Sequence, residues 1–504
     1  MNYLETEITN RTIIGLIILI TSLLMGIIGI FLFDGKIWGF NITLFGLLLI
    51  TFVLIIRIFS QLYMGYREYI LIITGVFFTL TLTWRDSLVL NSLSYLGLIL
   101  TISLAFNAST REKLRHLEIS QVFQDFILSI EYAIRSYREL IREDIQWNEL
   151  KSRWGDNVNS TLRGLMVTIP MLLIFGLLLV ASDARFEQAV YDSLDWGLSE
   201  EAVLRFGAIF IVCCWFSIAI LHGAVLTNNL IDGTKKLYFP IWRLGCIETG
   251  MILGAVNLLF LSFIIIQFTY FFGGDILVQS LDGPTYAIYA RRGFMQLIAV
   301  TLLVIILLIF THWLYRPYNQ FEKNLYQSLS IIMIIMTIII AASAAHRMYL
   351  YTSVYGFTEL RFYTSFFMLW LMVLFIWFSF TILRSKRTQF TFGAITSGLF
   401  FIALLHVINP DARIAEFNLE HLQVKQRFDA SYIASLSTDA IPTILANISY
   451  IEEKQRCKLW SYLNKLPVLQ TNKDWRAFNW SQYQAQTLWS GQLKPNCGIT
   501  YNSL

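Results

Sequence analysis

Charged residues are scarce in this chain of 504 residues. They make up 14% of the sequence, against about 25% in an ordinary soluble domain, while hydrophobic residues make up 56% and the mean hydropathy is +0.59. This balance excludes a soluble globular protein and predicts a polytopic membrane protein. The net charge of +4 is small, and the basic residues lie in short segments beside apolar runs, so nucleic acid is not predicted as a partner.

Several chemical motifs are also absent. The sequence shows no glycine-rich phosphate loop, heptad array, low-complexity tract or clean internal repeat, and its five cysteines lack metal-ligand spacing. Without repeats, the inverted-repeat argument for a transporter does not apply. No nucleophile–base pair can be read from the sequence, and no catalytic residue, cofactor or metal is predicted. Whether the protein is an enzyme is left open, with a non-enzymatic protein favoured.

What the sequence does contain is a series of long apolar runs. About 20 residues cross a bilayer as a helix, at about 1.5 Å each, so these runs predict membrane spans. Eleven spans are expected, of which the third is the shortest. They cover residues 12–33, 42–56, 69–83, 88–106, 164–182, 206–226, 249–272, 294–314, 329–345, 363–383 and 390–408.

The predicted fold class is therefore all-α: a polytopic transmembrane helical bundle of about eleven spans with a small helical C-terminal extramembrane cap. Four regions are expected. Residues 1–106 form an N-terminal four-span region, 107–163 a cytoplasmic amphipathic helical segment, 164–408 a seven-span core and 409–504 the cap. The amphipathic helix either lies on the membrane surface or packs on the protein itself, and the second interpretation is favoured.

Lysine and arginine concentrate on the cytoplasmic side of short membrane loops. Their distribution places the N-terminus in the cytoplasm and, with eleven spans, the cap outside. In the cap, Asp439 is predicted to be the N-cap of a helix whose first turn contains Pro442. Cys457 and Cys497 are a possible disulfide pair. Four tryptophans of the cap are expected to pack in its core, with sugar binding and the membrane interface as alternatives: Trp460, Trp475, Trp480 and Trp489.

Some polar and small residues within the spans have local interpretations. Asn257 is expected to hydrogen-bond to a neighbouring helix, and His222 to be a satisfied structural residue. Glu248 is expected to stabilise the N-terminus of its helix. Gly250 and Gly254 have the spacing that lets two spans approach closely.

Three polar clusters form the candidate site, all expected at the outer membrane boundary. Arginines there run against the positive-inside trend, and guanidinium groups match phosphate and carboxylate geometry. The clusters are Arg291 and Arg292 before the eighth span, His346 and Arg347 after the ninth, and Glu359 and Arg361 before the tenth.

Two interpretations of this site stay open. In the favoured one, the arginines pair with Glu359, Asp282, Asp411 or acids of the tail and clamp the cap onto the spans. In the other, they form an outward-facing pocket for an anionic group such as a lipid phosphate or lipid-linked intermediate. Tyrosines would line this pocket, namely Tyr286, Tyr289 and Tyr349.

Six stretches of the sequence carry a resemblance to a known family. They are Arg163–Gly164 leading to Pro170 and then LLLVASDARF ending at Phe186; QFTYFFGG (Gln267 to Gly274) followed by YAIYARRGF (Tyr286 to Phe294); RMYLYTSVYGFTELRFYT (Arg347 to Thr364); NPDARIAEFNL (Asn409 to Leu419); SLSTDAIP (Ser435 to Pro442); and DWRAFNWSQYQA (Asp474 to Ala485). Together they resemble a bacterial family of polytopic membrane proteins defined only as a domain of unknown function (DUF 4153/4173-type). The resemblance implies an integral protein of the bacterial cytoplasmic (inner) membrane, and implies no activity.

Three classes of function are compatible with these features. A non-enzymatic envelope protein, acting as a scaffold or sensor partner, is favoured. The alternatives are a transporter or lipid-handling protein with an outward-facing anion site, and a membrane enzyme acting on a lipid-linked substrate. The expected partners are membrane lipids, among them an anionic lipid headgroup, or another envelope protein.

Overall fold

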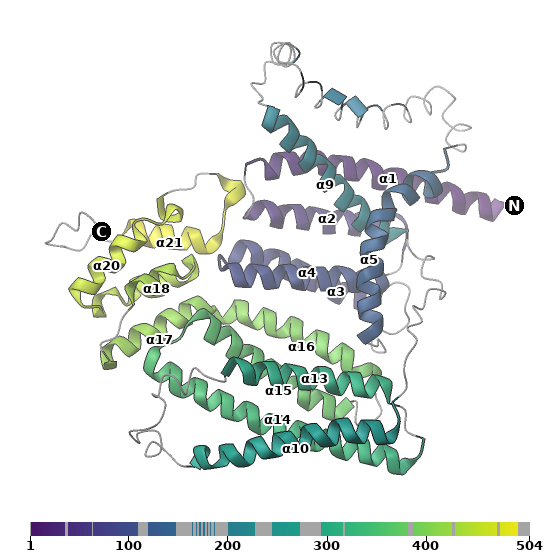
Figure 1. The fold of residues 1–504 in the computed structure, drawn as a ribbon. Helices are drawn as coiled ribbons and strands as arrows, with labels where there is room; N and C mark the ends of the chain where they lie inside the picture. Colours follow the sequence, from purple (N-terminus) through teal and green to yellow (C-terminus); the bar gives the residue numbers. More distant parts are fainter. Residues whose placement is uncertain are drawn as a thin grey trace.

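The computed structural model of this protein contains helices and no strands in the residues that it describes (Figure 1). It describes residues 2–35, 39–62, 64–108, 119–147, 200–226, 244–272, 294–315, 318–381, 387–425, 429–470 and 474–491, with scattered positions between 164 and 186. Within this part of the chain, nine helices are long and apolar enough to cross a membrane, and a tenth, α3, is a shorter apolar helix. The protein is thus a multi-pass, all-α membrane protein.

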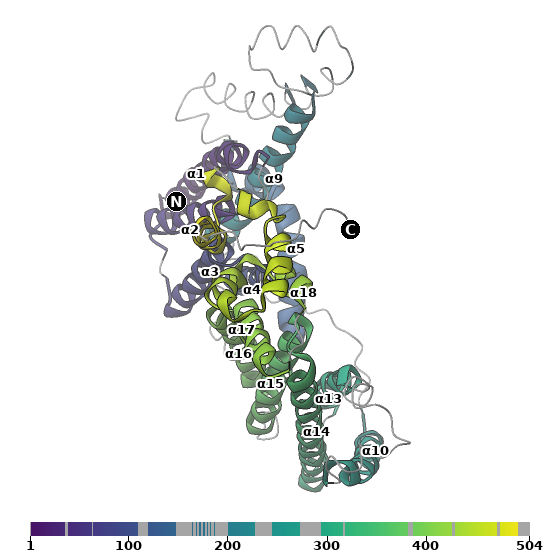
Figure 2. The same ribbon diagram turned by 90° about the vertical axis from the view of Figure 1, so that its left-hand side faces the viewer.

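The described spans form two groups, each with its own apolar core (Figure 2). The N-terminal group contains α1 (Asn2–Phe33), α2 (Phe40–Phe59), α3 (Tyr66–Trp84), α4 (Leu88–Ala108) and α9 (Glu200–Val225). The C-terminal group contains α10 (Cys246–Phe272), α13 (Phe294–Leu314), α14 (Gln320–Tyr355), α15 (Glu359–Thr381) and α16 (Arg387–Ile408). The groups meet where α16 packs against α4. Ten of the eleven predicted spans are confirmed as helices, and the fifth, at 164–182, lies outside the described residues apart from scattered positions.

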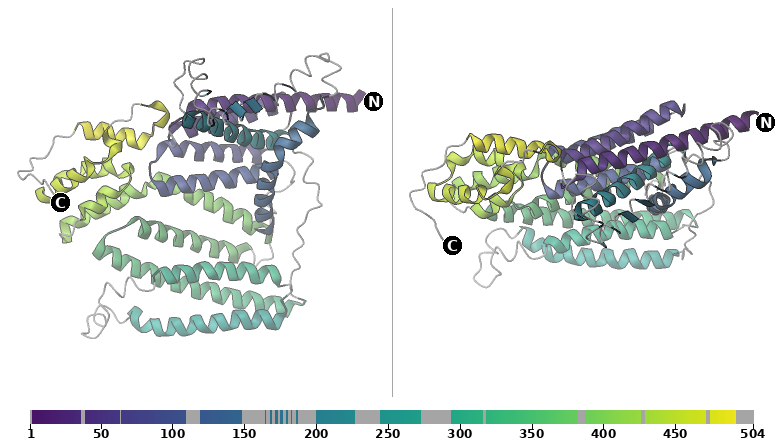
Figure 3. Two further views of the ribbon diagram at one scale, coloured as in Figure 1. Left: turned by 45° about the horizontal axis from the view of Figure 1, so that its top comes forward. Right: turned by 90° about the horizontal axis from the view of Figure 1, so that it is seen from above.

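The C-terminal cap covers one end of the bundle (Figures 1 and 3). It contains α17 (Pro410–Lys425), α18 (Ala430–Ser435), η4 (Thr438–Ala440), α19 (Ile441–Ala446), η5 (Ile448–Tyr450), α20 (Glu453–Leu463), η6 (Pro467–Gln470), η7 (Trp475–Ala477) and α21 (Trp480–Ser490). These short helices surround an apolar core of their own, which includes Ile414, Ile441 and Leu459. The predicted helical cap is therefore a compact unit seated on the spans.

The amphipathic helix is α5 (Ile119–Glu139), followed by the π-helical turn η2 (Leu140–Asp144). It crosses the ends of the spans roughly at right angles, at the end opposite the cap (Figure 1). It packs on α9, where the indole of Trp215 donates to the Ala133 carbonyl at 2.9 Å. Ile130, Ile134 and Tyr137 nevertheless stay exposed on its surface. Packing on the protein is thus confirmed, and the helix keeps a second apolar surface for the membrane boundary.

Two predicted span boundaries are wrong. His346 and Arg347 do not follow the ninth span but lie inside α14, which continues to Tyr355 because no helix-breaking residue intervenes. The helix ends at Gly356, whose φ of +75° suits glycine. Likewise, Glu359 begins α15 instead of preceding it, and an acidic residue in the first turn is favourable there.

Local predictions for single residues have mixed outcomes. Asn257 does reach a neighbouring helix, since its Nδ2 donates to the Leu329 carbonyl at 3.0 Å. Glu248 accepts the Gly245 backbone N–H at 2.6 Å, as expected at a helix start. Pro442 lies in the first turn of α19, but Ala440, not Asp439, is the N-cap. The carboxylate of Asp439 is used elsewhere, in the network described below.

The tryptophans and cysteines of the cap follow the same mixed pattern. Trp460 and Trp489 are half-buried, with ring centroids 4.2 Å apart. Core packing is wrong for Trp475 and Trp480, which are 49% and 44% exposed. Cys457 is disulfide-bonded. Since Cys497 lies outside the described residues, its pairing with Cys457 stays a prediction.

Two helices approach closely at Gly26 of α1 instead of at the predicted pair, Gly250 and Gly254. A Cβ atom on Gly250 or Gly254 would meet nothing within 4 Å in the described structure, so these glycines do not bring two spans together. On α1, by contrast, a Cβ on Gly26 would lie 2.8 Å from the Phe210 ring and collide with Cys214 of α9. The absence of a side chain there is what lets α1 and α9 pack closely.

Replacing Gly26 by leucine should therefore destabilise the protein by about 1–3 kcal/mol, because overpacking forces α1 and α9 apart. The expected result is a lower Tm in detergent, measured by size-exclusion chromatography after heating. Gly250→Leu is the matched control and should leave the Tm unchanged. Equal effects of the two substitutions would contradict the assignment of Gly26 as the packing position.

Candidate functional site

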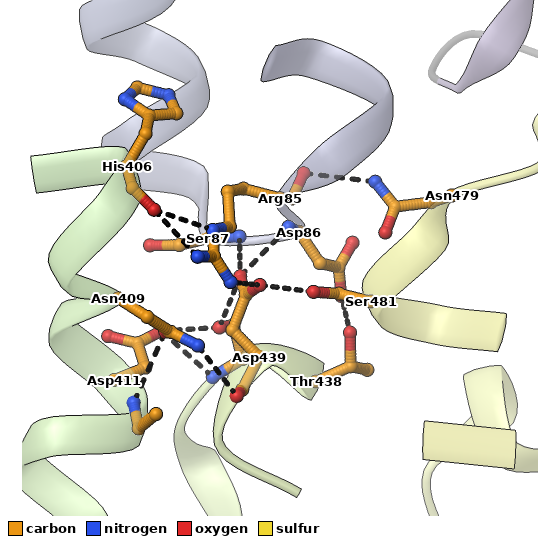
Figure 4. Close-up of polar contacts among 12 residues, drawn as sticks. Arg85, Asp86, Ser87, His406, Asn409, Asp411, Thr438, Asp439, Asn479 and Ser481 are labelled. Carbon is orange, nitrogen blue, oxygen red and sulfur yellow. Dashed lines mark hydrogen bonds and ion pairs between the residues drawn. The ribbon is translucent and has the colours of Figure 1, made fainter. Parts of the chain in front are cut away.

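A concentration of buried polar groups lies between the cap and the ends of the spans (Figure 4). Three parts of the chain meet there: the connection from α3 to α4, the connection from α16 to α17, and the cap. The labelled members are Arg85, Asp86, Ser87, His406, Asn409, Asp411, Thr438, Asp439, Asn479 and Ser481. We call this set the junction network.

Asp439 is the centre of the junction network. Its side chain has no exposed surface, and one carboxylate oxygen accepts the backbone N–H groups of Asp86 and Ser87, each at 2.9 Å. Ser481 donates its hydroxyl to the other oxygen. Since Ser87 accepts the first helical hydrogen bond of α4, from Asn91 N–H, the carboxylate sits at the positive end of that helix. A carboxylate from the cap thus stabilises the start of a membrane span.

Arg85 supplies the opposite charge and is itself buried. Its Nη1 lies 3.4 Å from an Asp439 oxygen, while Nε and Nη2 donate to the His406 carbonyl at 2.9 and 2.6 Å. The guanidinium also lies over the Trp84 ring, 4.5 Å from its centroid. A cation at the C-terminal end of α16 is favourable for the helix dipole. One side chain therefore ties α3, α16 and the cap together.

Two further carboxyl groups of the junction network have raised pKa values. Burial is the main cause for Asp411, whose pKa is raised to about 6; the charges of Glu359 and Asp439 add to this, and the hydrogen bond from Ser437 opposes it. Its Oδ1 has no hydrogen-bond partner among the described residues. Burial also raises the pKa of Asp86, against the hydrogen bonds from Thr438 and Gln482. Both carboxyl groups are thus more easily protonated than usual.

Asn409 directs the chain from the last span into the cap. Its φ is +55°, a left-handed conformation in which asparagine is the best residue after glycine, and Pro410 then starts α17. Its Nδ2 donates to the Asp439 carbonyl at 3.2 Å, and its Oδ1 accepts the Ala412 backbone N–H. Asn409 therefore both holds the turn that ends α16 and forms hydrogen bonds within the junction network.

The cap is also attached at other span ends. Asn418 of α17 accepts the Phe357 N–H at 2.7 Å and donates to the Phe357 carbonyl at 2.9 Å, which holds the turn between α14 and α15. At the N-terminal group, the Phe40 N–H donates to the Phe478 carbonyl at 2.9 Å, and Arg476 donates to the Phe31 carbonyl at 2.8 Å. The cap thus connects both groups of spans.

A second polar cluster lies at the opposite end of the bundle, under α5. His222 of α9 is buried and joins Asp144 through Nε2 at 2.5 Å and Tyr132 through Nδ1. Arg11 of α1 donates to Asp144 at 2.7 Å. Burial opposes ionisation of Asp144, but His222 and Arg11 outweigh it, so the pKa of Asp144 lies below its usual value. The prediction that His222 is a satisfied structural residue is confirmed.

The structure describes only some of the predicted site residues. Arg291 and Arg292 lie outside the described residues, as do Tyr286, Tyr289 and Asp282; α13 begins at Phe294. His346 is exposed and Arg347 buried on α14. Arg361 approaches α14, with its guanidinium 4.3 Å from the centroid of the Tyr351 ring and Nη1 donating to the Gly356 carbonyl at 2.7 Å. A contact between span and cap is nonetheless present at Glu359, whose N–H donates to Tyr432 at 2.8 Å.

Sequence reasoning missed Arg85, Asp86, Asn479 and Ser481. The available signal was the position of the family-like stretches. NPDARIAEFNL contains Asn409 and Asp411, SLSTDAIP contains Asp439, and DWRAFNWSQYQA contains Asn479 and Ser481. Three stretches separated in sequence supply one network, and Arg85–Asp86 is the charged pair between two apolar helices that completes it.

Comparison with known proteins identifies the family of this chain. The model of a family described as a domain of unknown function (DUF4153) matches residues 70–447. The chain therefore belongs to this family. No curated protein and no solved structure matches the chain. The match includes Asp439 and stops before α21, so it covers most of the junction network.

Asp439→Asn should destabilise the docking of the cap by about 3–5 kcal/mol, because it removes one partner of a buried ion pair and turns amide hydrogens toward N–H donors. Limited proteolysis should cut the cap faster, and the Tm should fall. The control is Arg413→Gln, which removes an exposed ion pair with Glu416 and should cost no more than about 1 kcal/mol. A stable, protease-resistant Asp439→Asn protein would show that the network is dispensable.

The raised pKa of Asp411 predicts a pH dependence. Because its folded-state pKa (about 6) exceeds the ordinary aspartate value of 3.8, its contribution is fully present below about pH 4 and is lost as pH rises through 6. A pKa difference of about 2 limits the effect to about 3 kcal/mol. The Tm of the wild-type protein should fall from pH 4.5 to pH 7.5 relative to Asp411→Asn, which cannot titrate. Parallel Tm profiles of the two proteins would refute this prediction.

Proposed function

We propose that this protein is a non-enzymatic membrane scaffold or sensor partner whose cap is its interaction surface. The single observation that carries the proposal is the junction network. Most of its donors and acceptors are engaged with one another across the cap and three span ends, and the Asp439 side chain is inaccessible to a substrate. Such a network fixes the orientation of one domain on another, which is what a scaffold requires.

The surfaces at the two ends support the same proposal. The cap exposes Tyr450 and Tyr462, whose side chains are 65% and 43% exposed, and neither is a member of the junction network. At the other end, α5 presents a charged surface that includes Arg135. We place the cap outside the cytoplasm and α5 inside, in accordance with the distribution of basic residues, and we place the protein in a bacterial inner membrane. The protein would then connect an external partner to the cytoplasmic face.

Two variants, each with one introduced cysteine and with Cys246 replaced by serine, test this arrangement. Tyr450→Cys should react with an impermeant maleimide in intact cells, whereas Arg135→Cys should react only after permeabilisation. Cys213 and Cys214 are buried and Cys457 is disulfide-bonded, so the background is low. A benzophenone maleimide on the Tyr450→Cys thiol should then give one discrete cross-linked species in the source organism.

The same cross-link should be weakened when Asp439→Asn is added, because the cap is then no longer held in one orientation. The Arg413→Gln control should leave it unchanged. Labelling of Tyr450→Cys only after permeabilisation would reverse the topology. Absence of any cross-link from the cap, with or without Asp439→Asn, would contradict the scaffold or sensor function.

A further inference from the structure

A cavity of about 550 Å³ lies between α14 and α15, next to the cap. This is within the usual size range of ligand pockets, about 300–1,000 Å³. It arises because α14 presents small side chains to α15, those of Ala341, Ala342 and Ala345. At the cap end, Asn418 fixes the turn between the two helices, and a Cβ atom on Gly356 would collide with it. The two helices are therefore held together at the cap end, and the cavity separates them further from the cap.

The walls of this cavity offer few polar groups to a ligand. Two of its three hydroxyl groups donate to carbonyls of their own helices: Thr352 to Met348 and Tyr349, and Ser365 to Arg361 at 2.7 Å. The third belongs to Tyr349, an exposed residue at the surface of the bundle. Most of the remaining lining is apolar, including the methionines Met348, Met368 and Met372. Methionine adapts to irregular ligands because it is unbranched and flexible. The chemistry thus fits a hydrocarbon chain.

The cavity is open toward the membrane. It is lined by residues of two candidate spans, Gln320–Ser353 and Glu359–Thr381, and so lies at membrane depth. Two of its lining residues, Tyr349 and Leu369, are 69% and 54% exposed, which places its opening on the outer surface of the bundle. The molecules that surround this surface in a bilayer are phospholipids. An acyl chain can therefore enter from the side without crossing a polar barrier.

A positive charge lies at the cap end of the cavity. Arg361 is one helical turn before Ser365, so both residues share a face of α15. The contacts of its guanidinium with Tyr351 and the Gly356 carbonyl keep it at the level of the turn between α14 and α15, where the spans end. His346 shares the cavity face of α14 with Ala342 and Tyr349, at helical spacings of four and three. A phosphate group belongs at this level of a bilayer.

We propose that this cavity binds one acyl chain of an anionic phospholipid from the surrounding bilayer, with the lipid phosphate beside Arg361. The site is separate from the junction network and does not depend on the scaffold function. It gives the region around Arg361 a role as a lipid site in addition to its contacts with α14. The bound chain would fill the space that the alanines of α14 leave.

The test is native mass spectrometry of the full chain released from nanodiscs of equal parts phosphatidylglycerol and phosphatidylcholine. The wild-type protein should retain one phosphatidylglycerol molecule. Ala345→Trp fills the cavity and should lower this retention roughly tenfold. The matched control is Ala255→Trp on α10, where the alanine is exposed but does not line the cavity, and retention should be unchanged. Equal retention by both variants would overturn the proposal.

Two further measurements cover the remaining outcomes. Arg361→Gln should reduce the preference for phosphatidylglycerol over phosphatidylcholine; an unchanged preference would overturn the assignment of the phosphate. If Ala345→Trp fails to fold, wild-type protein is photolabelled in vesicles with phosphatidylglycerol that carries a diazirine in one acyl chain. Adducts concentrated in 338–352 and 365–372 support the proposal. Adducts spread evenly over the lipid-facing helices overturn it.

Discussion

The structure depends on the burial of one carboxylate, that of Asp439. A charge without exposed surface is tolerated only when donors surround it, and the donors come from parts of the chain more than 350 residues away, as well as from the cap itself. Neither the cap nor the start of α4 can satisfy it alone. Docking of the cap and ordering of the connection from α3 to α4 must therefore occur together. This constraint selects one arrangement of cap on spans out of the many that apolar packing would allow.

Such a constraint matters more in a membrane than in water. Spans surrounded by lipid gain little from burying apolar surface against one another, so packing and hydrogen bonds decide their arrangement. The two groups of spans have separate apolar cores, and the cap has a third. Polar contacts also join them: Asp439 and Arg85 at the junction network, Asn418 at the turn between α14 and α15, and Arg476 at the end of α1. The cap thus acts as a connector between helices that would otherwise associate weakly.

The sequence predicted the spans well but did not reveal the junction network, for one physical reason. Hydropathy and helix caps are local signals, so ten of the eleven predicted spans appear as helices, and Glu248 and Pro442 lie as expected. Asp439 also looked local, because an aspartate before a helix is a typical N-cap. In the structure it does lie at a helix start, but that of α4 instead of α19. The same limit applies to Arg85, which pairs with the cap from a connection of three residues where no charge pattern distinguishes it. The predicted clamp at Arg291 and Arg292 stays a prediction, because both lie outside the described residues. Which helix ends meet is decided by three-dimensional packing, which a single sequence does not display.

The two polar clusters also respond to protons in opposite ways. Burial raises the pKa of Asp411 to about 6 and also raises the pKa of Asp86, so protonation of these two carboxyl groups stabilises the folded cap end. Asp144, at the opposite end, is held in its ionised form by His222 and Arg11, and its contribution is present above its usual pKa and lost only in stronger acid. Because the clusters lie at opposite ends of the spans, their carboxyl groups contribute to stability with opposite pH dependence at the two ends.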